Sequence, residues 1–460
     1  MKVRFTETCT APLPAIGAGK LTFPEIPSKK SSVDDFLEEG ISMVISTHDH
    51  FTGPGSKLPR SQRLYLAVLL GMMAAFGPLC TDTYLPSLPD LATDLSISTA
   101  MTQLTITSCL LGMALGQIFV GPISDNKGRR WPLFVSLALF TAASILCTLA
   151  NSGNAFIILR FAQGLGGAGG IVLSRAIACD LFRGSELTSF MSLLMSIQGI
   201  APILGPIAGG VIAGLGSWRL IFAALTLFGI VLFLMTIRAL PETLPAYQKG
   251  KGSIMASIRG MGELFREKAF LCYAGVQGFT MAGFFGYVAS SPFIIQNIYG
   301  LSATAYSIIF AINAFSIMLA ALITGRLSRH IGDATLLQTG DILRCLACMG
   351  TLVITIWTPE SPLPLLAAIF CMVALQGVTL TASFTLAINA QKVGAGTASG
   401  ILGVATFIFG ACSSPLVGLA GPDSAVPLGL VSAITGTLSL VLTVLGNRIS
   451  KRQLQTNAIS

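Results

Sequence analysis

From residue 64 onward, the chain alternates between long uncharged runs and short loops that carry charged residues. Each run is close to or longer than the roughly 20 residues that a helix needs to cross about 30 Å of hydrocarbon. The pattern therefore predicts an all-α membrane protein with about twelve membrane-spanning helices. We place these helices at residues 64–88, 98–121, 132–150, 154–176, 187–214, 218–239, 269–295, 302–325, 334–357, 362–387, 395–420 and 425–446.

The helices fall into two sets of six, which predicts an N-terminal bundle at residues 63–240 and a C-terminal bundle at residues 269–446. The glycine–serine–glycine spacing of GPISDNKG at 121–128 recurs in GRLSRHIG at 325–332, 204 residues later. Both segments lie between the second and third helix of their half. Two six-helix halves in parallel repeat are the plan of a secondary transporter, whose substrate path runs between the halves.

The segments outside the two bundles are more polar. Residues 1–62 contain charges, prolines and serines without a periodic apolar face, so we predict a largely disordered cytoplasmic arm. Residues 241–268 are predicted to form a cytoplasmic linker, and residues 447–460 a cytoplasmic tail.

Composition supports the membrane assignment, and the distribution of charge predicts its orientation. The chain is 53% hydrophobic and 10% charged, whereas soluble domains have about 25% charged residues. The net charge of +8 does not indicate nucleic-acid binding, because the basic residues are spread over short loops. If the N-terminus is cytoplasmic, 25 of the 28 Lys and Arg residues lie on the cytoplasmic side, the exceptions being Arg160, Arg219 and Arg344. Because basic residues concentrate on the cytoplasmic side of membrane proteins, this asymmetry predicts that both termini are cytoplasmic.

Motifs for nucleotide, metal or catalytic chemistry are not convincing in this sequence. GAGKL at 17–21 lacks the GxxxxGK[ST] spacing of a phosphate loop, and GLGGAG at 164–169 lies inside a predicted span, where glycines favour close helix packing. Cys345 and Cys348 form a CxxC pair inside another span, without a second ligand pair. We therefore expect no catalytic residues, no metal and no cofactor, and we expect an ion gradient to drive any uphill transport.

Asp82 is the most unusual residue of the first span. It follows the uncharged run 64–81 and is surrounded by Pro78, Pro86 and Pro89. A carboxylate at this depth is costly and usually functional. Facing a cavity of low dielectric constant, it could hold a proton near neutral pH. Alternatively, it could orient the helix by hydrogen bonding to backbone groups that the prolines leave free.

Other polar residues within the spans are further candidates. Tyr84 could contact a ligand or anchor the helix at the membrane interface. Arg160 could face a cavity or form a buried ion pair that holds helices together; an Arg160 close to Asp82 would favour the charged carboxylate. Asp341 and Arg344 are spaced i,i+3, so they share a helix face and can neutralise each other.

GPISDNKGRR at 121–130 resembles the signature loop of the major facilitator superfamily. From the residues alone, we expect Gly121 and Pro122 to end the second helix and Asp125 to be held by a helix N-terminus or a facing arginine. Lys127, Arg129 and Arg130 also fit a simple positive anchor on the cytoplasmic side. The resemblance implies that this loop is a latch that closes the cytoplasmic side; the residues that it assigns to the latch are Gly121, Asp125, Gly128, Arg129 and Arg130.

Three further segments extend the resemblance over residues 64–446. TDTYLPSLPDL at 81–91 is similar to the first-helix signature of drug:proton antiporters, in the form found in the bicyclomycin- and chloramphenicol-resistance (Bcr/CflA) subfamily. Arg160 and Gln163 match the fourth-helix R-x-x-Q-G motif, which implies proton coupling. GPIAGG at 205–210 resembles the fifth-helix signature of antiporters, although Ala201 stands where the longer signature often has glycine. We assign this segment a conformational role, carried by Gly205, Pro206, Gly209 and Gly210.

The resemblance implies a proton-driven exporter of hydrophobic drugs of the bicyclomycin, chloramphenicol and sulfonamide types. We expect a monomer in a bacterial inner membrane that interacts with small drugs or metabolites, protons and lipid but not with nucleic acid. The substrate and proton site would include Asp82, Tyr84, Arg160 and Gln163. A proton-coupled uptake symporter on the same fold is the first alternative, and a non-transporting receptor or a lipid scramblase is the second.

Overall fold

The computed structural model describes residues 59–244, 262, 264–357, 359–391 and 395–459. Within these residues, eleven single helices are long and apolar enough to cross a membrane, or twelve spans if one bent pair is counted as one. The prediction of an all-α membrane protein with about twelve spans is confirmed. Nearly all of the predicted arm and most of the predicted linker lie outside the described residues.

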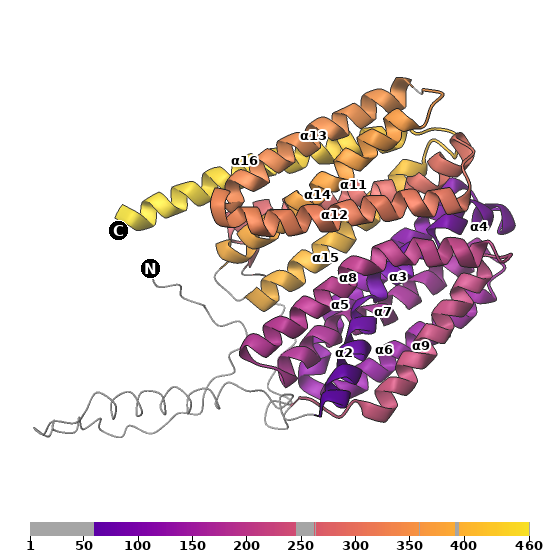
Figure 1. Ribbon diagram of the computed structural model, residues 1–460, viewed down its shortest axis with the longest axis horizontal. Coiled ribbons are helices and arrows are strands. Elements are labelled where there is room, and N and C mark those ends of the chain that lie inside the picture. The colour runs from indigo at the N-terminus through magenta and orange to yellow at the C-terminus, as the bar shows by residue number, and fades with distance from the viewer. Residues whose placement is uncertain (1–58, 245–261, 263, 358, 392–394, 460) are drawn as a thin grey trace, which may run out of the picture.

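The helices form two groups, one from each half of the chain, which Figure 1 shows in indigo to magenta and in orange to yellow. The first group contains α2 Arg60–Ala74, α3 Phe76–Asp82, η2 Leu85–Ser87, α4 Leu88–Asp94, α5 Thr99–Lys127, α6 Arg130–Thr148, α7 Gly153–Leu181, α8 Gly184–Ala213 and α9 Arg219–Ala239. The second contains α11 Lys268–Phe293, the π-helix η3 Ile294–Ile298, α12 Ala303–Ile331, α13 Asp333–Trp357, α14 Leu363–Ala390, α15 Ala395–Ser413, η4 Ser414–Gly418 and α16 Val426–Ile459.

The first predicted span is broken where the sequence suggested one helix. It bends by 42° between α2 and the segment that begins at Phe76. Pro78 has no N–H to donate to the carbonyl of Ala74, four residues earlier, so the helix loses a bond there. The side-chain amide of Gln198 in α8 donates to that carbonyl instead, at 3.1 Å. A neighbouring helix thus satisfies the backbone group that the proline leaves free.

The internal repeat extends to the ends of two equivalent helices. Both α5 and α12 contain 29 residues. Ser98 and Ser302 cap their N-termini, each accepting a hydrogen bond from the backbone N–H three residues later, at 3.2 and 3.1 Å. Gly128 and Gly332 end the two helices with φ of +91° and +84°, values that favour glycine. The GxxSxxxG repeat therefore specifies the same helix end twice.

Two predicted helix ends are wrong. Gly121 and Pro122 do not end the second span, because α5 continues through them to Lys127. Pro122 lies in the last turns of α5, where one missing N–H costs little, and the positive φ of Gly128 ends the helix. The segment 447–460, predicted as a tail, continues α16 as far as Ile459.

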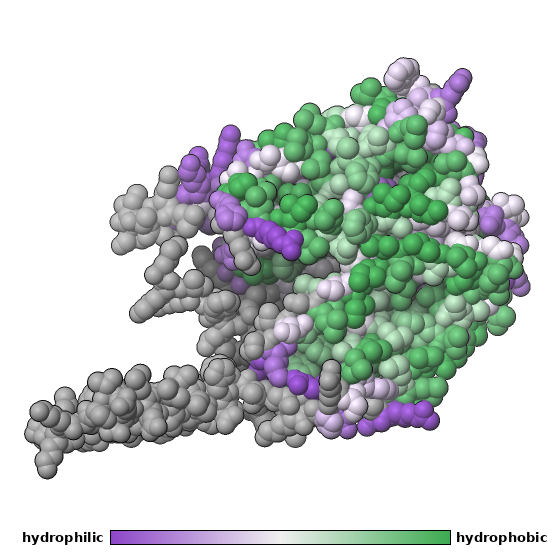
Figure 2. Space-filling model, in the orientation of Figure 1, coloured by the Kyte–Doolittle hydropathy of each residue, from purple (hydrophilic) through white to green (hydrophobic). Residues whose placement is uncertain are grey.

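The two halves meet along α8 and α12 and along α5 and α15. We call the end of the bundle where α5 ends at Lys127 and α12 at Ile331 the basic end. The opposite end, where α5 begins at Thr99 and α12 at Ala303, is the distal end. Figure 2 shows hydrophobic residues over the sides of both halves and the most hydrophilic residues toward the helix ends, as expected for a protein surrounded by lipid.

Candidate functional site

Asp82 ends α3 at the boundary between the halves, and only 4% of its surface is exposed. The hydroxyl of Thr81 donates to Asp82 Oδ1 at 2.7 Å. Among the described residues, no Lys, Arg or His lies within ion-pair distance of Asp82. The η2 segment that follows packs against α11 and α12 of the other half, which carry Tyr287 and Tyr306. Asp82 is therefore a buried acid next to the boundary between the two halves.

Arg160 of α7 is completely buried but does not pair with Asp82. Its guanidinium donates to the carbonyl oxygen of Cys80 at 2.7 Å and to the side chain of Gln163. Gln163 in turn donates to Ser144 at 2.7 Å. The alternative of a buried ion pair is not seen in this conformation, because no carboxylate of the described residues lies within ion-pair distance of Arg160. Instead, Arg160 holds the backbone two residues before Asp82.

Tyr84 lies inside the first half, so the interfacial-anchor interpretation is wrong. Its side chain is completely buried, and its hydroxyl lies 3.0 Å from that of Thr105 in α5. The Arg160 guanidinium stacks 4.3 Å from the centre of its ring. The ring also packs edge-on against Phe222 of α9, with the ring centres 5.7 Å apart.

The GPIAGG segment of α8 contacts both halves. A Cβ placed on Gly205 would lie 3.6 Å from Asp82 Cβ, and one on Gly209 only 1.7 Å from the carbonyl oxygen of Thr83. On the next residue, Gly210, a Cβ would lie 2.4 Å from the hydroxyl oxygen of Ser307 in α12. The small residues that the sequence singled out thus bring α8 against the Asp82 backbone and against the C-terminal half. Pro206 lies inside this helix, as expected.

A cluster of buried tyrosines in α11 and α12, which the sequence analysis did not identify, lies on the helices that pack against the η2 segment following Asp82. Tyr287 is buried, accepts a hydrogen bond from Asn313 at 2.8 Å and stacks on Phe310 at 5.7 Å. The hydroxyl of Tyr306 lies 3.4 Å from that of Ser291. The sequence does contain a signal for this cluster, because Tyr287 and Ser291, and Tyr306 and Phe310, are spaced i,i+4 and so share a helix face. This spacing alone does not show whether that face lines the substrate path between the halves.

At the basic end, the predicted latch residues converge on Arg129. Its guanidinium contacts Asp125, one turn away, and donates to Asp180 at the end of α7 at 2.9 Å. The side chain of Glu242 accepts from the backbone N–H of Arg129 at 2.8 Å and occupies the place that a Cβ on Gly128 would take. Asp180 and Glu242 were not predicted, although Glu242 lies in the segment LPETLP at 240–245, just after the sixth span, which also resembles the Bcr/CflA subfamily.

The remaining latch residues are more peripheral. Arg130 donates to the carbonyl of Ile237 at 3.3 Å, and its guanidinium lies 5.2 Å from the Phe134 ring. Gly121 lies within α5, with Val172 at ordinary van der Waals distance from the position of a Cβ. Arg129, rather than Arg130, is therefore the centre of the charged cluster.

At the distal end, neutral hydrogen bonds join the halves. Gln103 of α5 donates to the carbonyl of Ala289 at 3.3 Å, and its own backbone carbonyl accepts from Ser414 at 3.4 Å. Gln296 donates to the carbonyl of Pro86 at 2.9 Å. The structure thus shows a closed distal end, held by bonds that cost little to break because they carry no full charge.

The chain resembles known transporters over most of its length. Residues 64–422 match the family described as Major Facilitator Superfamily. The "Uncharacterized MFS-type transporter YdgK" of Bacillus subtilis is 41% identical over 380 residues, which are 82% of this chain and 94% of that protein. A "Bicyclomycin resistance protein homolog" of Haemophilus influenzae is 29% identical over 359 residues, covering 78% of this chain and 90% of that one.

The fold also matches a solved structure. A bacterial homologue of the human lysosomal transporter Spinster, in an inward-facing and occupied conformation, superposes with a TM-score of 0.69 over 85% of this chain and 98% of that chain, at 15% identity. At this identity the match shows the fold alone. The sequence and structural matches agree with the signature loop and the two-half architecture, and the chain belongs to the Major Facilitator Superfamily, a family of membrane transporters.

Proposed function

We propose that the protein is a proton-driven exporter that exchanges protons for small hydrophobic drugs by rocking its two halves about the site between them. The observation that carries the proposal is the position of Asp82. It is a buried carboxylate without an ion-pair partner among the described residues, at the place where α8 contacts both halves. A change in the relative position of the halves therefore changes the surroundings of this carboxylate.

In the proposed cycle, Asp82 carries the proton. A drug that enters from the basic end displaces the proton from Asp82, and reprotonation from the distal side resets the carrier. The Tyr287–Asn313 pair and Tyr306 would form the opposite wall of the drug site, because the helices that carry them pack against the η2 segment that follows Asp82. Arg160 would position the Cys80–Asp82 backbone through its bond to the Cys80 carbonyl.

The proposed substrates are of the bicyclomycin, chloramphenicol and sulfonamide types. A relative whose name refers to bicyclomycin resistance covers 78% of the chain, and several shorter matches are to proteins named multidrug resistance protein MdtL. We further propose a bacterial inner-membrane protein that acts as a monomer, with the basic end and both termini in the cytoplasm. The proton gradient would supply the energy.

The test is drug-induced proton movement in energised, inverted membrane vesicles. Wild type, Asp82→Asn and the control Asp90→Asn, an exposed carboxylate on α4, are compared at equal expression. We expect a panel of the three drug types to collapse the pH gradient with wild type and Asp90→Asn but not with Asp82→Asn. Collapse by none of the drugs, with confirmed insertion, would reject exchange for this panel and favour uptake or a receptor role.

A further inference from the structure

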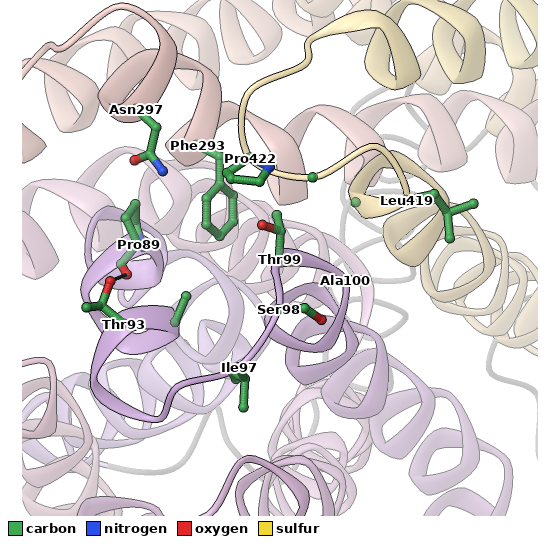
Figure 3. Close-up of a pocket in the computed structure, with 13 residues that line it drawn as sticks. Pro89, Thr93, Ile97, Ser98, Thr99, Ala100, Phe293, Asn297, Leu419 and Pro422 are labelled. Carbon is green, nitrogen blue, oxygen red and sulfur yellow. Dashed lines mark hydrogen bonds between the residues drawn. The ribbon is translucent and has the colours of Figure 1, made fainter.

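A pocket of about 570 Å³ lies at the distal end, between the two halves. Pro89 and Thr93 of α4 and the turn that leads into α5 form one wall. Phe293, Asn297 and the η4 segment form the other. Figure 3 shows the Phe293 ring between Asn297 and Thr99. The volume is within the range of about 300–1,000 Å³ that is typical of small-molecule sites.

The lining of this pocket favours an uncharged ligand. None of its thirteen described lining residues is charged. Phe293, Leu419 and Pro89 provide apolar surface, whereas Thr93 and Asn297 provide a hydroxyl and an amide. The Thr93 hydroxyl donates to the Pro89 carbonyl at 3.1 Å, so its oxygen can still accept a hydrogen bond. An amphipathic molecule with a ring or alkyl body and one or two polar groups fits this lining.

The floor of the pocket is also the contact that joins the halves. A Cβ on Gly418 would lie 2.0 Å from Gln103 Oε1 and 3.0 Å from Ala100 Cα, so the C-terminal half touches α5 directly there. Gln103 is 1% exposed, and its Oε1 has no hydrogen-bond partner among the described residues. If the halves separate at this end, Phe293 and Gly418 move away from Thr93 and Ala100, and the pocket is divided.

We propose that this distal pocket is a second small-molecule site, separate from the Asp82 region, which takes uncharged amphipathic molecules and holds the distal end closed when occupied. A ligand that binds one conformation better shifts the equilibrium toward it. Occupancy therefore slows transport from the distal end of the boundary between the halves, away from Asp82. The inference rests on the rocking motion of the proposed function but not on its proton coupling.

The test uses chloramphenicol as the uncharged probe and the purified full-length chain. A cysteine is introduced by Asn297→Cys in the pocket or by Thr304→Cys, an exposed position at the same end that does not line it. The rate of labelling by a water-soluble maleimide is measured with and without chloramphenicol, and the wild-type rate is subtracted as background. We expect saturating chloramphenicol to slow labelling of Asn297→Cys about tenfold, a typical coupling between two linked equilibria, and to leave Thr304→Cys unchanged.

Three further variants separate the pocket from the Asp82 region. We expect chloramphenicol still to protect Asn297→Cys from the maleimide when Asp82→Asn is added. Thr93→Trp, which fills the pocket, should abolish this protection. The matched control Thr304→Trp, outside the pocket, should leave the protection unchanged. Unchanged labelling of Asn297→Cys, equal slowing at both cysteines, or loss of protection with Asp82→Asn would each overturn the proposal. Failure of drug–proton exchange in vesicles would reject the proposed function without changing this protection.

Discussion

Gly209 packs so closely on Thr83 that a methyl group on Gly209 would lie 1.7 Å from the Thr83 carbonyl oxygen. The contact joins the fifth span to the residue that follows Asp82. Because the obstructing atom belongs to the backbone, no side-chain rotation can relieve a larger residue at this position. Any change in the tilt of α8 is therefore transmitted to the segment that carries the buried acid.

We predict that Gly209→Ala destabilises the protein and impairs transport. Overpacking in a well-packed interior typically costs about 1–3 kcal/mol, and a fixed backbone obstacle places this substitution at the upper end. The thermal midpoint of the purified variant should fall, and drug-induced proton movement should drop in vesicles.

Gly350→Ala is the matched control, because a Cβ on Gly350 meets no atom within 4 Å. In a helix interior, alanine is favoured over glycine by up to about 1 kcal/mol, so this variant should be at least as stable as wild type. Equal stability of Gly209→Ala and Gly350→Ala would show that α8 does not press on Thr83.

Asp341 and Arg344 form a buried ion pair in α13, which predicts a strong effect of removing one partner. The two side chains are 2.9 Å apart and at most 2% exposed, and Ser439 and Thr443 of α16 donate to the carboxylate at 2.8–3.1 Å. Asp341→Asn would leave Arg344 charged and buried, a change that typically costs about 3–5 kcal/mol. Thermal unfolding should show a large loss of stability.

The double variant Asp341→Leu/Arg344→Met distinguishes a buried charge from simple loss of contacts. Replacing both members of a buried pair by apolar residues is often neutral or stabilising, so this variant should recover much of the stability. If the double variant is as unstable as Asp341→Asn, the hydrogen bonds to α16, rather than the charge of Arg344, account for the effect.

The sequence predicted the spans well because each needs a long uncharged run, and hydropathy reports that requirement directly. The bend after Ala74 was harder to predict from the sequence. Pro78 marks the missing hydrogen bond, but only the structure shows that Gln198, on another helix, replaces it. The end of α5 was misplaced for a related reason: Pro122 is tolerated in the last turns, and the positive φ of Gly128 determines the end.

The candidate site was only partly predictable, because its contacts connect distant segments. Motif resemblance pointed to Asp82 and to GPIAGG separately, but nothing in the sequence shows that Gly205 and Gly209 lie against residues 82–83. The sequence could not show what Arg160 binds, and in this conformation the guanidinium binds the Cys80 carbonyl and Gln163 rather than a carboxylate. Tyr287 was missed because its position relative to the Asp82 segment depends on the packing of the two halves.

Arg129 and Arg130 are adjacent, but we predict different effects of changing each to lysine. Arg129 binds Asp180 and Ser124 at 2.9 and 2.8 Å through separate guanidinium nitrogens, a geometry that a lysine ammonium cannot reproduce. Arg129→Lys should cost roughly 1.5–3 kcal/mol, the range for hydrogen bonds to charged groups, and should impair transport.

Arg130→Lys removes one 3.3 Å bond to the Ile237 carbonyl and keeps the positive charge, so it is the matched control and should be nearly neutral. The free energies of unfolding and the transport rates of both variants are measured together. If the two variants behave alike, the loop acts as a positive anchor and not as a charged latch.

Gly418→Ala should open the distal end. A methyl group at residue 418 would lie 2.0 Å from Gln103 Oε1 and 3.0 Å from Ala100 Cα, and the latter is backbone that cannot rotate away. The halves must separate slightly to admit it, which also weakens the bonds from Gln103 to Ala289 and from Ser414 to Gln103. Each 1.4 kcal/mol of lost contact free energy changes the ratio of closed to open distal ends about tenfold.

Spin labels at Asp90→Cys and Thr304→Cys, one on each half, measure the separation of the halves directly. The distance distribution should shift to longer values in Gly418→Ala and remain as in the parent protein in Gly400→Ala, where a Cβ meets no atom within 4 Å. An unchanged distribution in Gly418→Ala would mean that the distal contacts do not determine which end is open.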